Sequence, residues 1–248
     1  MRFITLFLFI LSSSLRADVH PLLDHFHVCT VATYNHPHLE KLKTSCKKHK
    51  IELEVLGMHQ PWYGNGTKFA YTLDYLNTLK DYEIVLFVDA FDTLIVADKA
   101  VILEKFLNSN SLFTMSVEKN CHPCEAYKGV FPPSPTPFRY LNTGSYIGYV
   151  GYLKRWLQDL SPIDLHLCDQ GQTVAHYARD LKAKKFYTFD YFCDLFLPLL
   201  KVEENELSID RKNKTLYCLT TNSSPSVIHA NGGSFTLWNK IYERLIQE

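Results

Sequence analysis

Two carboxylates three residues apart follow an apolar run in the segment LFVDAFDTLI, residues 86–95. Asp89 comes directly after Val88, and Asp92 is followed by more apolar residues. Mg²⁺ and Mn²⁺ prefer oxygen ligands, and Mn²⁺ also accepts an imidazole. Such sites take one or two carboxylates from the protein and let substrate phosphates complete the coordination shell. The pair therefore indicates a nucleotide–metal site, and capping of a helix or turn by Asp92 is the structural alternative.

His229 is the candidate imidazole ligand. It follows the apolar residues SVI and precedes Ala230, Asn231 and the turn Gly232–Gly233. Glycines allow backbone N–H groups to approach an anion closely. This position favours a ligand role, while an ordinary core or surface role remains the alternative for one of eleven histidines.

The segment Cys121-His122-Pro123-Cys124 suggests a different chemistry. A C-x-x-C pair is typical of thiol–disulfide oxidoreductases, in which a helix N-terminus acidifies the first thiol. Here a proline-rich stretch follows instead of a helical pattern, so the pair is predicted to form a structural disulfide. A zinc site has no second cysteine pair to support it. The phosphate-binding patterns GxGxxG and GxxxxGK[ST] and the nucleophile pattern GxSxG do not occur in the sequence.

Alternating elements position the two acids. Strands are expected over residues 27–33, 51–56 and 84–88, with helices over 39–50 and 68–80 between them. This order predicts a parallel sheet built of right-handed strand–helix–strand units. Ligands bind such sheets just beyond the carboxyl ends of the strands. Asp89 and Asp92 lie there, at the mouth of the expected crevice.

The rest of the chain continues the α/β pattern. Further strands are expected over 111–117 and 145–150, helices over 99–108, 152–160, 169–181 and 237–247, and a hairpin from 206–210 and 215–219. Residues 121–139 hold five prolines and are expected to form a loop, which at that length is usually functional or mobile.

Composition restricts the class of protein. The chain has 248 residues, of which 46% are hydrophobic and 21% charged, and its formal net charge is zero. These values are typical of a globular protein, and we expect one domain over residues 20–248. Nucleic acid and anionic membranes are disfavoured as main partners because both require a basic excess.

The N-terminus has the pattern of a secretory signal. Arg2 precedes the apolar run 3–11 and a group of small residues, so we expect a signal peptide over residues 1–19 and a secreted or lumenal protein. The run is shorter than the ~20 residues of a membrane span, although an uncleaved anchor remains the alternative. The seven cysteines leave at least one thiol unpaired, and Cys29, within an apolar strand pattern, is predicted to be a buried free thiol.

Four segments in order resemble one family, the glycosyltransferase domain of the multifunctional procollagen lysyl hydroxylases, here expected as a stand-alone domain. LFVDAFDTLI is similar to that family's acidic metal motif, and RYLNTGSYIG, residues 139–148, is similar to its FLNSGGFIG segment. Asp169-Gln170 falls where the family has an acidic run followed by glutamine, and VIHANG is similar to its C-terminal metal-binding segment. The resemblance extends from VCTVAT to SVIHANG.

The resemblance implies a GT-A fold, that is, a Rossmann-like, mainly parallel central sheet flanked by helices, with a C-terminal hairpin and helix. It also implies a retaining, Mn²⁺-dependent transfer of glucose or galactose from UDP-glucose or UDP-galactose. The acceptor would be hydroxylysine, its galactosyl derivative or another hydroxyl group. The implied metal ligands are Asp89, Asp92 and His229. The implied donor-binding residues are Thr30, Lys68, Tyr71, Asn231 and Gly232. Asn142 would line the sugar pocket, and Asp169 would lie near the reacting carbon or the acceptor.

The sequence departs from the family pattern at three places. The acidic run is reduced to Asp169, preceded by Leu167-Cys168; His122 replaces a family tryptophan; and Phe235 stands where a basic residue is expected. These differences bear on the acceptor and on catalytic efficiency more than on donor binding. The alternative function is therefore a non-catalytic module of the same fold that binds a nucleotide sugar or a glycan.

Overall fold

The computed structural model describes residues 21–123, 125–179, 183–185 and 187–247. The expected signal peptide lies outside these residues, and so does Cys124, the predicted partner of Cys121. Within the described residues, no helix combines the length and the apolar character needed to cross a membrane.

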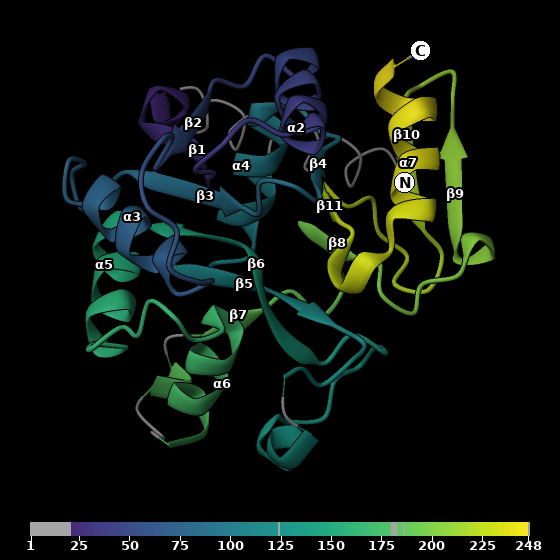
Figure 1. The fold of residues 1–248 in the computed structure, drawn as a ribbon. Coiled ribbons are helices and arrows are strands. Elements are labelled where there is room, and N and C mark those ends of the chain that lie inside the picture. The colour runs from purple at the N-terminus through teal and green to yellow at the C-terminus, as the bar shows by residue number, and fades with distance from the viewer. Residues whose placement is uncertain (1–20, 124, 180–182, 186, 248) are drawn as a thin grey trace, which may run out of the picture.

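A six-stranded sheet forms the centre of the molecule (Figure 1). In spatial order its strands are β2 (Leu53–Leu56), β1 (Phe26–Val31), β3 (Ile84–Val88), β6 (Tyr140–Tyr149), β5 (Phe113–Glu118) and β7 (Thr188–Phe189). Strands β2, β1 and β3 pair in parallel, as do β5 and β7, while β6 runs antiparallel to both of its neighbours. The sheet is therefore mainly parallel, which confirms the predicted α/β class and the central sheet expected of a GT-A fold.

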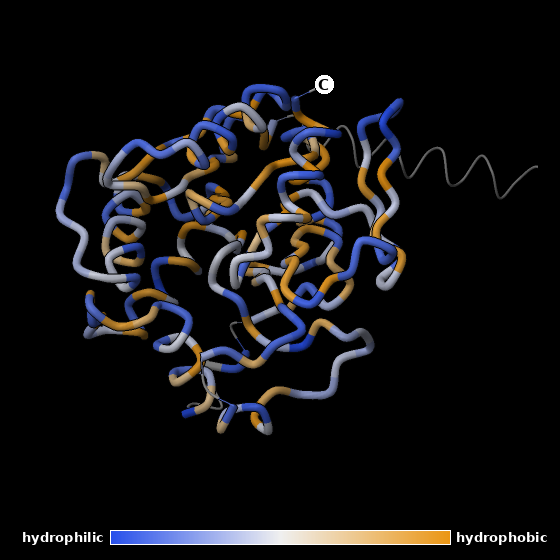
Figure 2. Tube along the Cα trace, turned by 45° about the vertical axis from the view of Figure 1, so that its right-hand side comes forward, coloured by the Kyte–Doolittle hydropathy of each residue, from blue (hydrophilic) through white to orange (hydrophobic). Residues whose placement is uncertain are grey.

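Helices cover both faces of this sheet, as expected for strands that are apolar throughout. The helices are α2 (Pro37–Lys48), α3 (Thr67–Leu76), α4 (Lys99–Asn108), α5 (Val150–Asp159), α6 (Asp169–Arg179) and α7 (Phe235–Tyr242). In β3, Val85 and Phe87 pack into a cluster with α3, α5 and α6, whereas Leu86 and Val88 pack into another with α2 and α4. Figure 2 shows hydrophobic stretches in the centre of the molecule.

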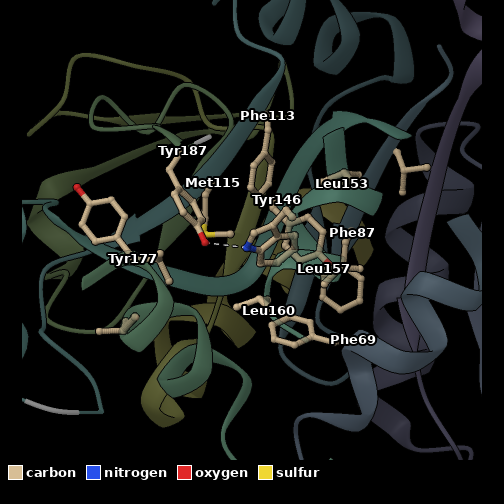
Figure 3. Packing of buried hydrophobic residues seen from close by; sticks show 14 of the residues in the cluster. Phe69, Phe87, Phe113, Met115, Tyr146, Leu153, Leu157, Leu160, Tyr177 and Tyr187 are labelled. Carbon is tan, nitrogen blue, oxygen red and sulfur yellow. Dashed lines mark hydrogen bonds between the residues drawn. The ribbon is translucent and has the colours of Figure 1, made fainter. Parts of the chain in front are cut away.

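Aromatic side chains fill the first of these clusters (Figure 3). Phe87 of β3 stacks on Tyr146 of β6 with ring centroids 4.7 Å apart, and Trp156 of α5 lies edge-on to Tyr146 at 5.1 Å. The indole N–H of Trp156 donates a 2.8 Å hydrogen bond to the hydroxyl of Tyr187. Aromatic pairs of this kind contribute about 0.5–1.5 kcal/mol each beyond area burial. They fix β6 against β3 next to the strand end that carries Asp89.

A second, three-stranded sheet holds the C-terminal half of the candidate site. Its order is β4 (Thr93–Ile95), β11 (Val227–His229) and β8 (Phe196–Pro198), with β11 antiparallel to β4 and parallel to β8. A third apolar cluster joins it to α7 and to the hairpin of β9 (Leu207–Asp210) and β10 (Thr215–Cys218). The predicted C-terminal hairpin and helix are confirmed. Strands β4, β7 and β8 were not predicted from the sequence, because strands of two or three residues are too short for a periodic signal.

Several predicted boundaries were wrong. The helix expected over 68–80 ends at Leu76, and the one expected over 39–50 begins at Pro37, where His36 Nδ1 accepts a 3.1 Å hydrogen bond from the His38 amide. The helix expected over 169–181 ends at Arg179 within the described residues. The last helix begins at Phe235 and continues from Tyr242 into a π-helical turn over Glu243–Gln247. Pro37 fits the first helical position because its missing N–H has no partner there.

Candidate active site

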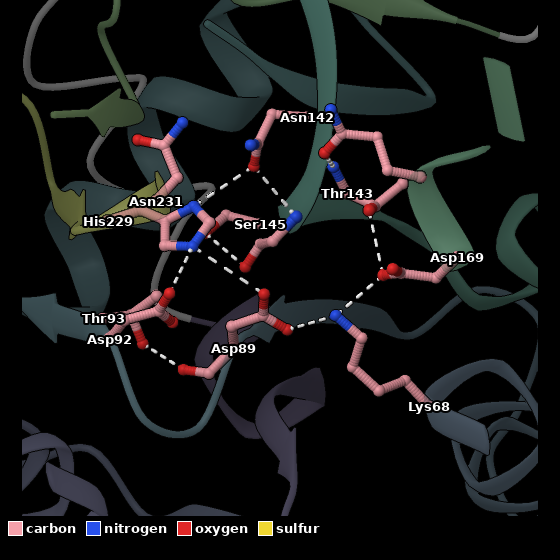
Figure 4. A network of polar contacts seen from close by, with 12 residues as sticks. Lys68, Asp89, Asp92, Thr93, Asn142, Thr143, Ser145, Asp169, His229 and Asn231 are labelled. Atoms are coloured by element: carbon pink, nitrogen blue, oxygen red, sulfur yellow. Dashed lines mark hydrogen bonds and ion pairs between the residues drawn. The ribbon is translucent and has the colours of Figure 1, made fainter. Parts of the chain in front are cut away.

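The structure brings Asp89, Asp92 and His229 together (Figure 4). Asp89 follows β3 and Asp92 precedes β4; the pairing of β4 with β11 places Thr93 opposite His229. His229 Nε2 lies 3.1 Å from Asp92 Oδ2 and 3.7 Å from Asp89 Oδ2. One ligand atom from each residue lies within 4.8 Å of the other two. Two carboxylate oxygens and one imidazole nitrogen are a donor set that suits Mn²⁺.

A bulge of three residues in β6 borders this site. Along β5, Met115 pairs with Tyr146 whereas the next residue, Ser116, pairs with Asn142, so Thr143, Gly144 and Ser145 are left over on β6. Bulges of this kind redirect side chains and often occur next to functional sites. The bulge turns Thr143 and Gly144 toward the cluster of acids, where the Asp89 amide donates a 2.8 Å hydrogen bond to the Gly144 carbonyl.

Gly144 leaves the space that the His229 ring occupies. A Cβ atom at this position would lie 2.0 Å from His229 Cε1 and 2.6 Å from Nδ1. No side chain fits there unless the ring or the strand moves. The space around the ring and the chemistry of the three donors both fit a bound divalent cation.

Asn142 determines which nitrogen of His229 faces the acids. Its Nδ2 donates to Glu118 at 2.9 Å and its Oδ1 accepts from the Gly144 amide at 3.0 Å, so Oδ1 must also be the acceptor for His229 Nδ1, at 3.1 Å. The Nδ1 atom therefore carries a proton, and Nε2 is the nitrogen directed at the two carboxylates. A metal-binding histidine is commonly oriented by such a hydrogen bond at its other nitrogen.

Burial and mutual charge shift the pKa values of the three residues. Burial would lower the pKa of His229, but the carboxylates of Asp92 and Asp89 outweigh it and raise that pKa. Burial raises the pKa of Asp89 to about 6, against the opposing effect of Lys68. For Asp92, His229 outweighs burial and lowers the pKa. The pKa of each of these three residues therefore depends on the charge of at least one of the other two. A bound cation would replace the proton on His229 Nε2.

Lys68 connects this trio to Asp169. Its Nζ lies 2.7 Å from Asp89 Oδ1 and 2.7 Å from Asp169 Oδ2, and the residue is buried in the first turn of α3. Burial would lower the pKa of Lys68, but the two carboxylates outweigh it and raise that pKa, so the side chain is cationic. Asp169 begins α6, where the helix dipole favours an acid, and also accepts a 2.9 Å hydrogen bond from the Thr143 hydroxyl.

Glu118 is a site residue that sequence analysis missed. It ends β5, is 2% exposed, and accepts hydrogen bonds from three side-chain amides: Asn142 at 2.9 Å, Gln170 at 3.0 Å and Asn231 at 2.8 Å. Burial raises its pKa in spite of these donors. Glu118 directly follows the strand expected over residues 111–117, just as Asp89 directly follows the strand expected over residues 84–88. The same pattern could therefore have identified Glu118.

These residues line one cavity of about 210 Å³. Of the predicted site residues it contains Lys68, Asp89, Asp92, Asn142, Asp169, His229, Asn231 and Gly232. A neighbouring hollow of about 220 Å³ shares Lys68, Asp89 and Asp92 with it and adds the aromatic residues Trp62, Phe91 and Phe235. We call the first cavity, which is lined by Lys68, Asp89, Asp92, Asp169 and His229, the charged well. We call the neighbouring hollow, which contains the three aromatic residues, the aromatic annex.

Two predicted donor-binding residues lie elsewhere. Thr30 of β1 is fully buried, and its hydroxyl has no hydrogen-bond partner among the described residues. Tyr71 donates a 2.7 Å hydrogen bond to the Pro61 carbonyl and packs against Gly57. Neither residue lines the cavity or the annex. Cys29, in contrast, is the buried free thiol that was predicted.

Comparison with known proteins gives the class and then the family. A family model described as "PLOD GT domain" matches residues 23–246, which is nearly all of the described chain. The match identifies the protein as a glycosyltransferase. The chain belongs to the PLOD glycosyltransferase-domain family, as its motifs predicted.

Curated relatives in two animals show the extent of the similarity. The chain is 28% identical over 226 residues to a multifunctional procollagen lysine hydroxylase and glycosyltransferase of Caenorhabditis elegans; the match covers 86% of this chain and 31% of the relative. It is also 28% identical over 223 residues to a procollagen-lysine,2-oxoglutarate 5-dioxygenase of Drosophila melanogaster, covering 84% and 31%. The chain thus spans about a third of the length of these relatives.

Among solved structures, the chain is similar to a glycosyltransferase involved in glycosylation of the major capsid of PBCV-1. The TM-score is 0.48 at 11% identity, and the match covers 88% of this chain and 98% of the other.

Proposed function

We propose that this protein transfers glucose or galactose from UDP-glucose or UDP-galactose to a hydroxyl acceptor, with Mn²⁺ held by Asp89, Asp92 and His229. The observation that carries the proposal is the convergence of these three side chains with Lys68 and Asp169 in one cavity of a PLOD-type glycosyltransferase domain. When bound, the metal would supply a Lewis acid that neutralises charge on the diphosphate leaving group.

The donor nucleotide is proposed to span the charged well and the aromatic annex. Trp62, Phe91 and Phe235 offer the flat apolar surfaces on which a nucleoside base can pack. Lys68 and the Asn231–Gly232 turn line the charged well, where the diphosphate would lie. Gly232, which lines the same cavity, has a φ of +61°, a conformation that glycine adopts without strain.

The sugar is proposed to lie between the metal trio and Asp169. Asn142 is held by Glu118 and is available to line the sugar pocket, as the resemblance implies. Asp169 would stabilise positive charge on the sugar ring or orient the acceptor hydroxyl. Retention through attack on the same face needs no nucleophile from the enzyme, so the sugar would pass directly from UDP to the acceptor.

The acceptor is proposed to be a hydroxylysine or galactosyl-hydroxylysine group in a collagen-like protein, within a secretory compartment or outside the cell. The names of the two animal relatives support this acceptor class, because they refer to procollagen lysine. The apolar N-terminal segment supports the localisation.

The decisive experiment measures release of UDP from UDP-glucose and from UDP-galactose, with Mn²⁺ or with EDTA, and with or without a hydroxylysine-containing collagen peptide. Metal-dependent release from one donor, stimulated by the peptide, is the expected result. Asp89→Ala and Asp92→Ala are each expected to lower turnover by about a hundredfold or more, with unchanged circular dichroism. Equal metal-dependent turnover by these variants would refute the proposed site.

A non-catalytic binding module is the second candidate, because Leu167-Cys168 replaces part of the family's acidic run. This alternative predicts tight Mn²⁺–UDP binding with no release of UDP from either donor.

Asp169→Asn tests the role of Asp169 within the site. Transfer is expected to fall while UDP binding persists, and a loss of UDP affinity would reassign Asp169 to the donor site.

A further inference from the structure

Lys68 lies between the two functional halves of the cavity. Its ammonium group makes two short contacts, 2.7 Å to Asp89 Oδ1 on the metal side and 2.7 Å to Asp169 Oδ2 on the opposite side. The Asp89 oxygen that faces His229 is the other one, Oδ2. Figure 4 shows Lys68 reaching from α3 to both carboxylates. Ion pairs that are short and largely shielded from water, as these are, are strong.

This arrangement has an electrostatic consequence for a cation. An incoming dication at Asp89, Asp92 and His229 would share the Asp89 carboxylate with the ammonium group and would be repelled by it. Charges a few ångströms apart in a partly buried site interact strongly, because the effective dielectric constant there is about 20. Lys68 therefore opposes metal binding as long as it remains on Asp89.

A bound diphosphate would remove this repulsion between Lys68 and the metal. Lys68 and Asn65 line both the charged well and the aromatic annex, so a nucleotide that enters both would come within reach of the ammonium group. Lysine has a flexible stem and three donors, and it readily exchanges one oxygen partner for another. Once Lys68 moves to a phosphate oxygen, both Asp89 and Asp169 lose their internal counter-ion.

We propose that Lys68 is a positioning residue that couples metal binding to nucleotide binding: it neutralises Asp89 and masks Asp169 in the free protein, and transfers to the donor diphosphate when metal and nucleotide bind together. The inference rests on the proposed function for its ligands. Its result is that Asp169 becomes available to the sugar or the acceptor only when the donor complex is in place.

The first test measures Mn²⁺ affinity in the absence of nucleotide, by titration with electron paramagnetic resonance detection of free Mn²⁺. Lys68→Met is expected to bind Mn²⁺ about tenfold more tightly than wild type, because a repelling charge is lost next to the site. Lys68→Arg keeps the charge and is expected to remain within about twofold of wild type. Lys154→Met removes a lysine from an ion pair with Asp81 outside this cavity and is expected to have no effect.

A second variant keeps the inference testable if Lys68→Met folds poorly. In Asp169→Asn the ammonium group has only Asp89 as a carboxylate partner, so Mn²⁺ is expected to bind about three- to tenfold more weakly. The double variant Lys68→Met/Asp169→Asn is expected to bind Mn²⁺ about as tightly as Lys68→Met, because Asp169 acts on the metal site through the ammonium group. If Asp169→Asn binds Mn²⁺ as tightly as wild type, or if folded Lys68→Met binds Mn²⁺ no more tightly than wild type, the inference is wrong.

The third measurement repeats the Mn²⁺ titration with saturating UDP. In wild type, UDP is expected to tighten Mn²⁺ binding, and by linkage Mn²⁺ tightens UDP binding by the same factor. In Lys68→Met that factor is expected to shrink about tenfold, because Mn²⁺ alone already binds well and the diphosphate has lost its cation. An unchanged factor would overturn the proposed transfer of Lys68 to the diphosphate.

Asp89→Asn distinguishes this inference from the proposed function. If Asp89→Asn leaves Mn²⁺ affinity unchanged, the metal site itself is wrong, and the proposed function fails with it. If Asp89→Asn loses Mn²⁺ but Lys68→Met gains nothing, only the role of Lys68 is wrong.

Discussion

At the residue scale, the candidate site depends on side chains that fix one another's orientation. Glu118 holds Asn142, Asn142 holds His229 Nδ1, and this chain of contacts leaves Nε2 facing the acids. Each link is largely shielded from water, so a broken link leaves a buried polar group without a partner, which costs about 1–3 kcal/mol. Two substitutions test this arrangement without touching a proposed metal ligand.

Gly144→Ala tests the contact beneath the imidazole. Its Cβ would lie 2.0 Å from His229 Cε1, so the ring or β6 must shift. We expect Mn²⁺ binding to be lost and the free energy of unfolding to fall by about 1–3 kcal/mol, measured by metal titration and urea denaturation. Gly129→Ala is the matched control, because an added Cβ there meets no atom within 4 Å. Retained Mn²⁺ affinity in Gly144→Ala would contradict the described geometry.

Glu118→Gln tests the residue that joins three amides. The new amide presents N–H groups toward donors from Asn142, Gln170 or Asn231, so at least one of these contacts becomes a donor facing a donor. We expect the free energy of unfolding to fall by about 1–3 kcal/mol and turnover to fall more strongly than UDP affinity. If stability and turnover both matched wild type, Glu118 would have no orienting role.

At the element scale, the site forms where two sheets meet. The pairing of β11 with β4 brings His229, near the C-terminus, beside Asp92. The bulge in β6 lies against the His229 ring through Gly144, whose carbonyl accepts a hydrogen bond from the Asp89 amide. The other end of β3 is held separately. Glu83, just before β3, accepts a 2.7 Å hydrogen bond from the Lys80 amide and lies 3.3 Å from His27 Nε2.

Glu83 is expected to make stability depend on pH in the acid range. The hydrogen bond from Lys80, with help from His27, lowers the pKa of Glu83 despite its burial. A carboxyl group with a lowered pKa in the folded state contributes stability that is complete above its unfolded pKa and lost as pH falls through the folded one. Glu83→Gln should therefore flatten the decline in unfolding free energy roughly between pH 5 and pH 3. Parallel curves for variant and wild type in urea titrations would show that Glu83 does not contribute.

At the scale of the whole molecule, ligands bound where the two sheets meet should stabilise the entire fold. The three apolar clusters each border the strands that carry site residues, so a ligand held by β3, β6 and β11 bridges them. Binding to the folded state alone adds about 2.7 kcal/mol at a ligand concentration of a hundred times Kd.

Mn²⁺ together with UDP is therefore expected to raise the midpoint of thermal unfolding by several degrees, about 2–4 °C per kcal/mol for a chain of this size. Differential scanning fluorimetry measures this shift, EDTA should reverse it, and Asp92→Ala should abolish it. An equal shift in Asp92→Ala would mean that the ligands bind elsewhere.

The α/β class and the position of Asp89 and Asp92 at a strand end could be predicted from the sequence, which also marked His229 as a candidate ligand. These features are local: an apolar run that ends in a carboxylate is visible without knowing which strand lies beside it. The same rule applied to β5 would have identified Glu118. Short strands such as β4 and β8 carry no such local signal, because tertiary pairing alone defines them.

Which side chains meet depends on how the helices and strands pack in three dimensions. The family resemblance implied that Thr30 binds the donor, but β1 is buried on both faces, and the fold encloses that hydroxyl in the core. Lys68 and Asp169 lie about a hundred residues apart in the chain, and they meet because α3 and α6 pack into the same apolar cluster. This difference arises because hydrophobic periodicity is a property of one segment, whereas an ion pair across a cavity depends on how several segments pack together.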